Sequence, residues 1–408
     1  SGPLLCRWLY QQAGRSRQIR PIREIIKEDL MERVSERRRE PEPVIYSTVI
    51  EQSQQFVRDF QQRLENAPRV VKFNQYPTMT NAMARHKQYT QHEPANEGHI
   101  QHRAKRLAIT SFNLREQIFP PGMKSGVHRH FLEAVFYIIE GEGHVIHDGV
   151  KYPWEAGDVI CVPTYCIHER ANSSNTKEAR MLVSTHLVFE LLGLESTEQI
   201  KVNANYRPPS GAKEVRDSQG EIIGYKYPDG LELKIGADPK LQALMEAKKQ
   251  VEFAGQPRDT YDRYCQTLVE QTRWRFSMPH VVKGREIPWE NTRMGKIKHL
   301  VSPYRPSPLM LYDVYVQEIP PGGHSGKHRH VSEEAHKILS GRGYDIHDGK
   351  RYDWEAEDVV AVPINTVHQH FNASPDKPAT FVSFQSRIFH HLGHGGFEHM
   401  EDTPDYRA

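Results

Sequence analysis

The chain contains the same segment twice. Residues 120–172 align with residues 320–372 at a constant offset of 200 positions, without a gap and with 26 identities in 53 positions. The shared stretches read PPG, HRH, IHDG and WEA, and the same register continues to Gly193 and Gly393. Two widely separated copies do not suit a solenoid, in which each repeat packs on its neighbours. The sequence therefore predicts two copies of one domain.

Each copy has the pattern of a small β domain. In the first copy, residues 134–139 and 159–162 are short apolar runs rich in β-branched and aromatic side chains, which favour strands. Asp148-Gly149 lies between these runs and is a tight-hairpin signal. Short strands at close spacing, with turns between them, predict a sandwich or a barrel. We therefore expect a mainly β fold.

Outside the two copies the sequence favours helices. Apolar residues recur at helical spacing among many charges in four segments, 22–39, 51–65, 241–253 and 261–274. Residues 203–236 are polar and carry Pro208-Pro209 and Pro228-Asp229-Gly230, so we interpret them as the inter-domain connection. We expect a helical N-terminal extension over 1–104, the first domain over 105–195, a partly helical linker over 196–300, and the second domain with its tail over 301–408.

The composition excludes several classes of protein. Among the 408 residues, 54 Lys and Arg oppose 52 Asp and Glu, a net charge of +2 that argues against a nucleic-acid binder. No apolar run approaches the roughly 18–20 residues that span a bilayer, and the N-terminus shows no signal-peptide pattern. The four cysteines are too few and too scattered for a disulfide framework (Cys6, Cys161, Cys166, Cys265). We expect a cytoplasmic protein without nucleic-acid or membrane partners.

The chain has 23 histidines, and the repeat arranges six of them as candidate metal ligands. Alternate side chains of a strand share a face, so His128 and His130 project together. A barrel can bring His168, from a later strand, beside them. The second copy repeats the arrangement with His328, His330 and His368. Three imidazoles suit Fe(II), Mn(II), Cu(II), Ni(II) or Zn(II), and six positions in register disfavour the alternative of ordinary core histidines.

The spacing of these residues resembles the two motifs of the cupin family. The first copy reads Gly122-x5-His128-x-His130, then Gly157-x5-Pro163-x4-His168-x3-Asn172. The second copy follows the same pattern, except that Glu357 stands where the motif has glycine. The resemblance implies a bicupin, with two jelly-roll type β-barrels, and it identifies a fold more firmly than a function.

The two copies differ at a ligand position. Cupins usually place a Glu ligand where the second copy has Glu334, whereas the first copy has Ala134. Glu133 is adjacent, but in a regular strand it faces the other way. Site two (His328, His330, Glu334, His368) then resembles the sites of oxalate decarboxylases and quercetinases. Site one (His128, His130, His168) has more open coordination positions, as a metal that binds both substrate and dioxygen needs.

Site one resembles the amino-terminal cupin of gentisate, salicylate and 1-hydroxy-2-naphthoate dioxygenases. That resemblance implies three-histidine iron and cleavage of an aromatic ring with insertion of both oxygen atoms. The chain departs from this family in two ways. Phe136 stands where the family usually has an Arg for the substrate carboxylate, and the second copy keeps its metal ligands. These departures leave open a substrate without a carboxylate and an active site in the second copy.

Further side chains are expected around the two sites. Arg170 lies two residues after His168, where it could supply the cation that Phe136 lacks. His336 and His370 are candidate acid–base groups of site two, and His324 lies nearby in sequence. Other residues are assigned structural roles. We expect His147 and His347 at the surface near a turn, Trp154, Trp354, Cys161 and Cys166 in the barrel interior, and His390, His391, His394 and His399 in a solvated tail or a subunit contact.

These patterns predict a non-haem, metal-dependent dioxygenase that cleaves the ring of a dihydroxy-, hydroxycarboxy- or amino-substituted phenol. We expect Fe(II) as the cofactor, with Mn(II), Cu(II) or Ni(II) as alternatives, and a small aromatic substrate and dioxygen as partners of a homo-oligomer. The first alternative function is an oxalate decarboxylase-like manganese lyase, or a quercetinase-like dioxygenase, that uses the second copy. The second is a metal-binding bicupin without enzymatic activity.

Overall fold

The computed structural model describes most of the chain from residue 46 onward. The described residues are 46–73, 79–80, 85–89, 107–188, 197–208, 210–237, 239, 243, 256–305, 307–393 and 395–406. The chain divides into two compact units, Ser1–Arg63 and Leu64–Ala408, and both copies of the repeat lie in the second unit. The predicted helix over 22–39, nearly all of the predicted helix over 241–253, Cys6 and His394 lie outside the described residues.

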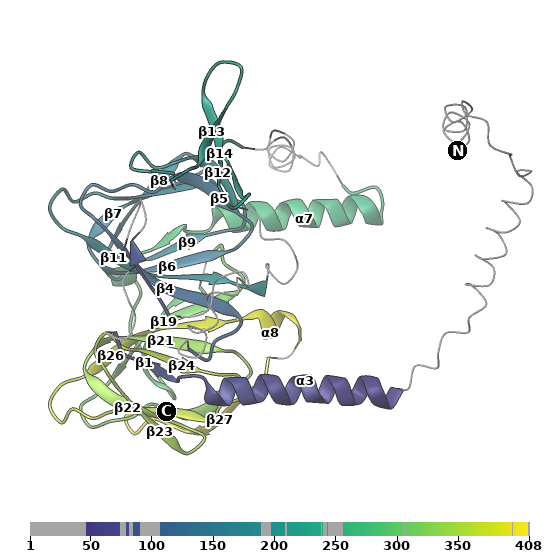
Figure 1. Ribbon diagram of the computed structural model, residues 1–408. Helices are drawn as coiled ribbons and strands as arrows, with labels where there is room; N and C mark the ends of the chain where they lie inside the picture. The colour runs from purple at the N-terminus through teal and green to yellow at the C-terminus, as the bar shows by residue number, and fades with distance from the viewer. Residues whose placement is uncertain are drawn as a thin grey trace, which may run out of the picture. The chain divides into compact units, whose positions relative to one another are not determined.

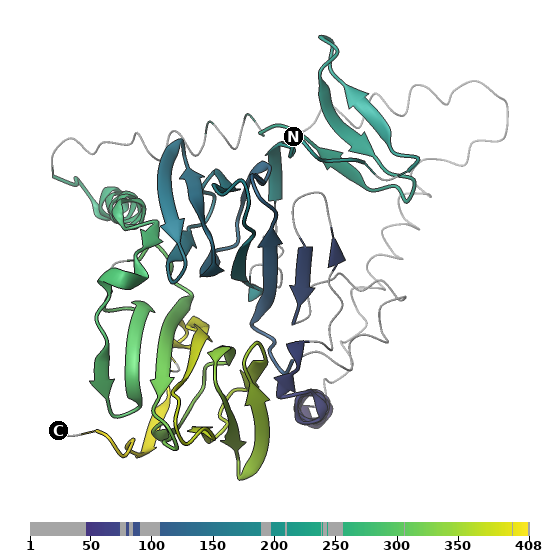
Figure 2. The same cartoon turned by 90° about the vertical axis from the view of Figure 1, so that its left-hand side faces the viewer.

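Each copy of the repeat folds into a β-barrel of two sheets, as predicted (Figures 1 and 2). The eight strands of the first barrel are β4 (Phe112–Phe119), β5 (Val127–His130), β6 (Ala134–Glu140), β7 (Glu142–His147), β8 (Val150–Glu155), β9 (Val159–Val162), β10 (His168–Asn172) and β11 (Ala179–His186). Their counterparts in the second barrel are β19 (Tyr312–Ile319), β20 (Lys327–His330), β21 (Glu334–Ser340), β22 (Arg342–His347), β23 (Lys350–Glu355), β24 (Val359–Val362), β25 (His368–Asn372) and β26 (Ala379–Ser386).

Further strands join these sheets from outside the repeat. β2 (Met79–Thr80), β3 (Arg85–Gln88) and β12 (Thr197–Lys201) extend barrel 1, whereas β17 (Glu290–Thr292), β18 (Gly295–Val301) and β27 (Phe397–Glu401) extend barrel 2. Among the described residues, each barrel thus consists of a seven-stranded and a five-stranded sheet. The sheets of barrel 1 extend beyond the expected range 105–195 on both sides, and those of barrel 2 include strands that begin before residue 301.

The two barrels exchange short strands. β1 (Val70–Val71), which precedes barrel 1 in sequence, pairs with β24 of barrel 2, and β16 (Val281–Val282), which precedes barrel 2, pairs with β9 of barrel 1. Matching ion pairs follow the two strands: Lys72 Nζ lies 2.6 Å from Asp358 Oδ2, and Lys283 Nζ lies 2.6 Å from Asp158 Oδ2. Each barrel therefore depends on a segment that precedes the other in the chain.

One apolar core runs across both barrels. It includes Leu114 and Leu182 from the first and Val314 and Phe384 from the second, all without measurable exposure. Trp154 and Trp354 pack inside their own barrels, as predicted. Each indole fills the space beside a strand glycine, since a Cβ at Gly143 would lie 2.3 Å from the Trp154 ring. The core and the exchanged strands join the two barrels into one unit.

The segments outside the two barrels confirm part of the prediction. The helices expected over 51–65 and 261–274 are present as α3 (Tyr46–Asn66) and α7 (Thr260–Ser277), and Asp259 caps α7 by accepting from the backbone N–H of Asp262. A short 3-10 turn, η3 (Gly284–Glu286), follows β16. Unexpectedly, the polar connection over 203–236 carries a three-stranded antiparallel sheet of β13 (Lys213–Arg216), β14 (Ile222–Lys226) and β15 (Glu232–Lys234). Its turns lie at Gly220 and at Pro228-Asp229-Gly230, which we had assigned to a linker.

The predicted C-terminal tail is wrong in part. His390 and His391 belong to a short helix, α8 (Ile388–His391), and His399 lies on β27. β27 pairs with β20 so that His399 lies directly across from His328. The tail therefore completes a sheet of barrel 2, because the strand edge of β20 offers backbone groups that need partners.

Candidate metal centres

The three predicted ligands of site one meet inside barrel 1. His128 and His130 alternate on β5, and β10 pairs with β5 so that His168 lies directly across from His128. The ring centroids of His168 lie 4.2 Å from His128 and 4.8 Å from His130. One ligand atom from each side chain can lie within 4.8 Å of the others. The strand register therefore assembles the triad that the repeat predicts.

The rings of site one are oriented by backbone carbonyls. The Nδ1 atoms of His128, His130 and His168 lie 3.1, 2.6 and 2.9 Å from the carbonyl oxygens of Gly126, Leu132 and Cys166. A carbonyl only accepts, so each Nδ1 donates and each Nε2 keeps a free lone pair. The buried Nε2 of His168 has no hydrogen-bond partner among the described residues.

Burial also keeps these imidazoles neutral. It lowers the pKa of His128 to about 3 and the pKa of His130 to about 4, and it lowers the pKa of His168 well below its usual value. A nearby guanidinium, that of Arg170, adds to the effect on all three. Neutral imidazoles with free Nε2 lone pairs fit a divalent first-row metal ion.

Among the described residues, site one has no carboxylate of its own. Ala134 is buried in the apolar cluster inside barrel 1, and Glu133 points away from it, as the strand alternation predicts. The Glu133 carboxylate accepts from the backbone N–H groups of Met310 and Leu311, both at 2.9–3.0 Å for Oε2, and pairs with Arg275. Its counterpart in barrel 2, Glu333, accepts in the same way from the backbone N–H groups of Thr110 and Ser111, which precede β4 of barrel 1. These two glutamates join the barrels and are not available to a metal.

Two arginines that pair with no carboxylate of the described residues face the triad. Arg170 is 4% exposed, and its guanidinium carbon lies 4.0 Å from the centroid of the Phe136 ring. Its Nε has no hydrogen-bond partner among the described residues, and no described carboxylate pairs with it or with Arg115 on β4. Burial lowers the pKa of Arg170 to about 9 and that of Arg115 to about 10, so both remain cations at neutral pH.

The sequence reasoning found Arg170 but missed Arg115. The alternation along β4 was a usable signal, since Arg115 lies at the position of Tyr315 in the repeat. The expectation that Arg170 shares the face of His168 agrees with its effect on the pKa of that histidine. Phe136 does not replace a cation here, because the guanidinium of Arg170 lies over its ring. The interior of barrel 1 is therefore positively charged.

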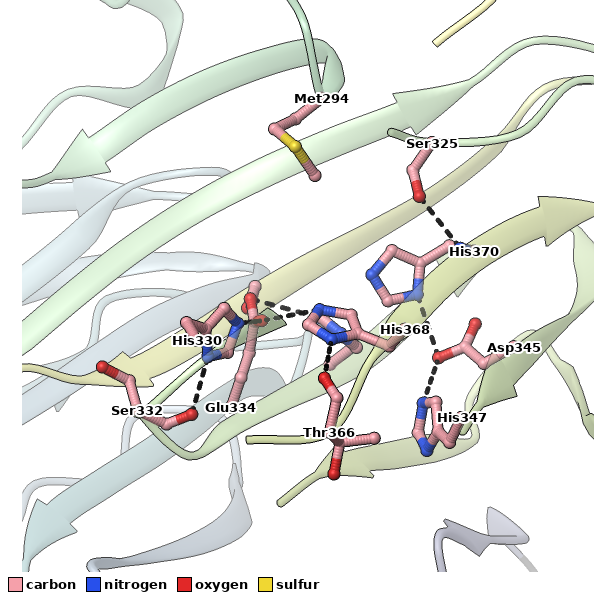
Figure 3. Close-up of polar contacts among 12 residues, drawn as sticks. Met294, Ser325, His330, Ser332, Glu334, Asp345, His347, Thr366, His368 and His370 are labelled. Carbon is pink, nitrogen blue, oxygen red and sulfur yellow. Dashed lines mark hydrogen bonds and ion pairs between the residues drawn. The ribbon is translucent and has the colours of Figure 1, made fainter. Parts of the chain in front are cut away.

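Site two brings together all four predicted ligands in barrel 2 (Figure 3). The ring centroids of His328 and His368 lie 4.1 Å apart, and His330 Nε2 lies 3.1 Å from Glu334 Oε2. The other Glu334 oxygen accepts from Tyr315 and Ser383. Although burial opposes ionisation, the neighbouring histidines hold the pKa of Glu334 well below its usual range.

A cavity of about 760 Å³ opens onto site two. His328, His330 and Glu334 form one side of it, and other walls include Ile297, Phe397 and Arg387. Phe397 comes from β27, so the C-terminal strand helps to enclose the cavity. This volume is in the range of small-molecule sites.

The predicted acid–base residues His336 and His370 lie deeper in barrel 2. Both are 1% exposed, and their ring centroids are 4.6 Å apart. Asp345, which the sequence reasoning missed, lies with its Oδ2 2.9 Å from His370 Nδ1 and 3.3 Å from His347 Nε2. Its Oδ1 accepts from the indole of Trp354 at 2.8 Å.

The structure corrects the predicted exposure of two histidines and confirms the predicted burial of two cysteines. His147 and His347 were expected at the surface but are 1% and 3% exposed, and each lies directly across from a buried ligand histidine, His168 or His368. His147 Nδ1 lies 2.6 Å from His280 Nδ1, and the two form a candidate ligand group with Cys166. His324 lies 2.9 Å from the Gln369 amide. Cys161 and Cys166 are buried as expected, and burial raises the pKa of the Cys161 thiol to about 12.

The comparison with known families agrees with this architecture. The family pattern described as "Cupin domain" matches twice, over residues 115–185 and 315–384. The chain is a bicupin. No helix in the described part of this bicupin is long and apolar enough to cross a membrane.

The bicupin is related to gentisate-type ring-cleaving dioxygenases. It is 39% identical over 82 residues to a gentisate 1,2-dioxygenase of Ralstonia sp., a match that covers 20% of this chain and 22% of that enzyme. It is 22% identical over 276 residues to a 1-hydroxy-2-naphthoate 1,2-dioxygenase of Nocardioides sp. strain KP7, covering 65% and 61% of the two chains. Less than two thirds of either relative is therefore matched.

A solved structure shares the fold over a longer stretch. Salicylate 1,2-dioxygenase from Pseudoaminobacter salicylatoxidans, in its adduct with gentisate, superimposes with a TM-score of 0.50 at 13% identity. The superposition covers 89% of this chain and 96% of that one. At this identity the likeness shows the fold, while the chemistry has to come from the residues of the two sites.

Proposed function

We propose that this bicupin is a metal-dependent dioxygenase that cleaves the aromatic ring of a phenolic carboxylate at site one. One observation carries the proposal. Three neutral imidazoles with free Nε2 atoms lie beside the buried guanidinium of Arg170, which has no carboxylate partner among the described residues. An unpaired buried cation is costly unless an anion joins it. A substrate carboxylate would complete this site.

Each residue of site one has a proposed role. His128, His130 and His168 hold the metal, which when bound supplies the electron transfer that lets dioxygen react with the ring. Ala134 leaves a coordination position free, where barrel 2 has Glu334. Arg170, with Arg115 behind it, binds the substrate carboxylate through a bidentate pair. Phe136 positions the guanidinium by stacking beneath it. His336 and His370, in the other barrel, have no part in this reaction.

We propose Fe(II) as the metal, with Mn(II), Cu(II) or Ni(II) as alternatives. Three imidazoles accept several first-row ions, and ligand type alone does not select among them. The relation to the gentisate-type enzymes and the absence of a carboxylate ligand at position 134 favour iron over the manganese of a decarboxylase. Dioxygen and a small aromatic acid are the proposed partners, and a homo-oligomer remains our expectation.

A second candidate function rests on the cavity of about 760 Å³ at site two. Its three histidines and Glu334 resemble the donor set of oxalate decarboxylases and quercetinases, so catalysis in barrel 2 is the alternative. The cavity walls carry Arg387, whose Nε lies 3.7 Å from Asp313. A bicupin that binds metal without turnover is the remaining alternative.

Oxygen uptake separates these possibilities. The Fe(II)-loaded chain is assayed with gentisate, salicylate and 1-hydroxy-2-naphthoate, and carbon dioxide release is measured with oxalate. We expect oxygen uptake with at least one aromatic acid, lost in His168→Ala and retained in the matched variant His368→Ala. Carbon dioxide release without oxygen uptake would reject the proposal, and loss of oxygen uptake only in His368→Ala would move catalysis to site two.

Metal analysis locates the two sites independently of activity. We expect His128→Ala to lose one metal ion per chain while site two stays loaded. An unchanged metal content would contradict the assignment of site one.

A further inference from the structure

Three interior positions change together between the two barrels. Each lies on a strand that the repeat aligns without a gap, and in barrel 1 none of the three carries a metal-binding side chain. In barrel 2 all three do. The pairs are Phe136 and His336, Val145 and Asp345, and Arg170 and His370.

The three barrel 2 residues converge although they come from three strands. His336 lies on β21, Asp345 on β22 and His370 on β25, and the pairing of β22 with β25 places Asp345 directly across from His370. One ligand atom from each side chain lies within 4.8 Å of the others. All three side chains are 1% exposed. Figure 3 shows Asp345 between His370 and His347, away from Glu334 and His330.

Several ring nitrogens of this cluster lack a hydrogen-bond partner among the described residues. Both ring nitrogens of His336 and the Nε2 of His370 are buried without a hydrogen-bond partner among the described residues. Leaving such a polar atom unpaired costs about 1–3 kcal/mol. Barrel 1 avoids the cost at position 136 with a phenylalanine, which has the same place in the fold. The presence of His336 and His370 in barrel 2 therefore indicates a bound group, other than protein atoms, that contacts their free nitrogens.

The chemistry of the cluster identifies that ligand. We propose that His336, Asp345 and His370 bind a divalent first-row transition-metal ion, at a site distinct from site two. Two imidazoles and one carboxylate are a donor set that such ions accept. Asp345 is already held by Trp354 and His347, which are the kind of outer partners that orient a ligating carboxylate.

The new site lies next to site two and does not share its ligand set. His336 Nδ1 is 3.8 Å from Glu334 Oε1, and the ring centroids of His368 and His370 are 5.4 Å apart. The Glu334 carboxylate therefore lies between the two clusters, where its charge offsets part of the repulsion between two cations. Barrel 2 then holds two ions, and barrel 1 holds one in its repeat-derived site.

Metal stoichiometry tests the proposal without reference to turnover. The full chain, stripped with a chelator, is dialysed to equilibrium against Co(II), and bound cobalt per chain is measured by elemental analysis and by its visible absorption. We expect His336→Phe and His370→Arg, which introduce the barrel 1 residues, each to bind one ion fewer than the wild type. The double variant His328→Ala/His336→Phe should bind two fewer.

Matched controls keep the result interpretable. His347→Phe, which removes only an outer partner of Asp345, should keep the wild-type number of ions at saturating cobalt. An anomalous difference map of cobalt-loaded wild-type crystals should show a peak among His336, Asp345 and His370, so a misfolded variant does not leave the proposal untested. An unchanged stoichiometry in both single variants, or no peak at that position, would overturn it. In that case His347, Asp345 and His370 form a hydrogen-bonded chain without a metal.

Discussion

Replacing Arg170 by glutamine is the most direct test of the proposed substrate. The variant keeps a planar polar group over the Phe136 ring but removes the positive charge that lies over it. Arg170 is 4% exposed and has no described carboxylate partner, so its charge is not needed to neutralise a protein group. Folding should therefore tolerate the change, and the loss should appear in catalysis.

The expected size of the effect follows from the lost charge-assisted hydrogen bonds. A hydrogen bond to a charged group contributes about 1.5–3 kcal/mol, which corresponds to a loss of about 10- to 150-fold in kcat/KM. Removing the guanidinium also removes one cause that lowers the pKa of His128, His130 and His168. Their pKa values should rise, but burial is the larger cause and should keep them neutral at pH 7. Metal content should thus stay unchanged.

The assay compares matched substrates. Oxygen uptake is measured for each aromatic acid and for its counterpart without the carboxylate: gentisate with hydroquinone, salicylate with phenol, and 1-hydroxy-2-naphthoate with 1-naphthol. We expect Arg170→Gln to lower kcat/KM for the acids only, and Arg170→Lys to recover part of it, since lysine keeps the charge without the planar fork. An equal loss for acids and counterparts, or a loss below about threefold, would refute the role of Arg170.

Three further predictions concern ligation, stability and pH. Ala134→Glu should keep the metal of site one but lower oxygen uptake about tenfold or more, because the new carboxylate occupies an open coordination position; unchanged turnover would count against site one as the catalytic site. Glu133→Gln should lower the free energy of unfolding in urea by about 1.5–3 kcal/mol, since the amide cannot accept from all the N–H groups that the carboxylate binds. Glu333→Gln should have an effect of the same size. A change below about 0.5 kcal/mol would contradict the role of these glutamates in joining the barrels. The free energy of unfolding of the metal-free chain should fall as the pH drops below about 6.5, by up to about 1.4 kcal/mol per pH unit for each buried histidine. The reason is that the unfolded state takes up protons that His128 and His130 do not bind until about pH 3–4. His128→Phe should make this pH dependence shallower, and an identical slope would show that His128 is not the titrating group.

Much of the fold could be predicted because two copies of the repeat show the same sequence pattern, and each copy supports the interpretation of the other. The apolar, β-branched and aromatic run over 134–139 and the Asp148-Gly149 turn predict strands and a hairpin, and both are present, with Asp148 at φ 47° and Gly149 at φ 86°. The exchanged strands β1 and β16 could not be predicted, because two residues are too short for a periodic signal. The C-terminal strand was missed since its pairing depends on a free strand edge in barrel 2 and not on its own composition.

The candidate sites divide in the same way. The HRH motif and the later histidine determine by themselves that three imidazoles share one barrel, and Ala134 and Glu334 determine which barrel has a carboxylate ligand. The sequence also pointed to Arg170, His336 and His370 near the triads, but the other charged neighbours became visible only in the tertiary structure. Arg115 lies on β4, in the other sheet of barrel 1 from β5 and β10, and Asp345 on β22 lies directly across from His370. Neither position belongs to the motifs that carry the ligands. The sequence thus specifies the donor atoms of each candidate metal site. Packing between strands makes one barrel interior cationic and the other rich in carboxylate and imidazole, because side-chain contacts across a barrel follow strand pairing and not chain order.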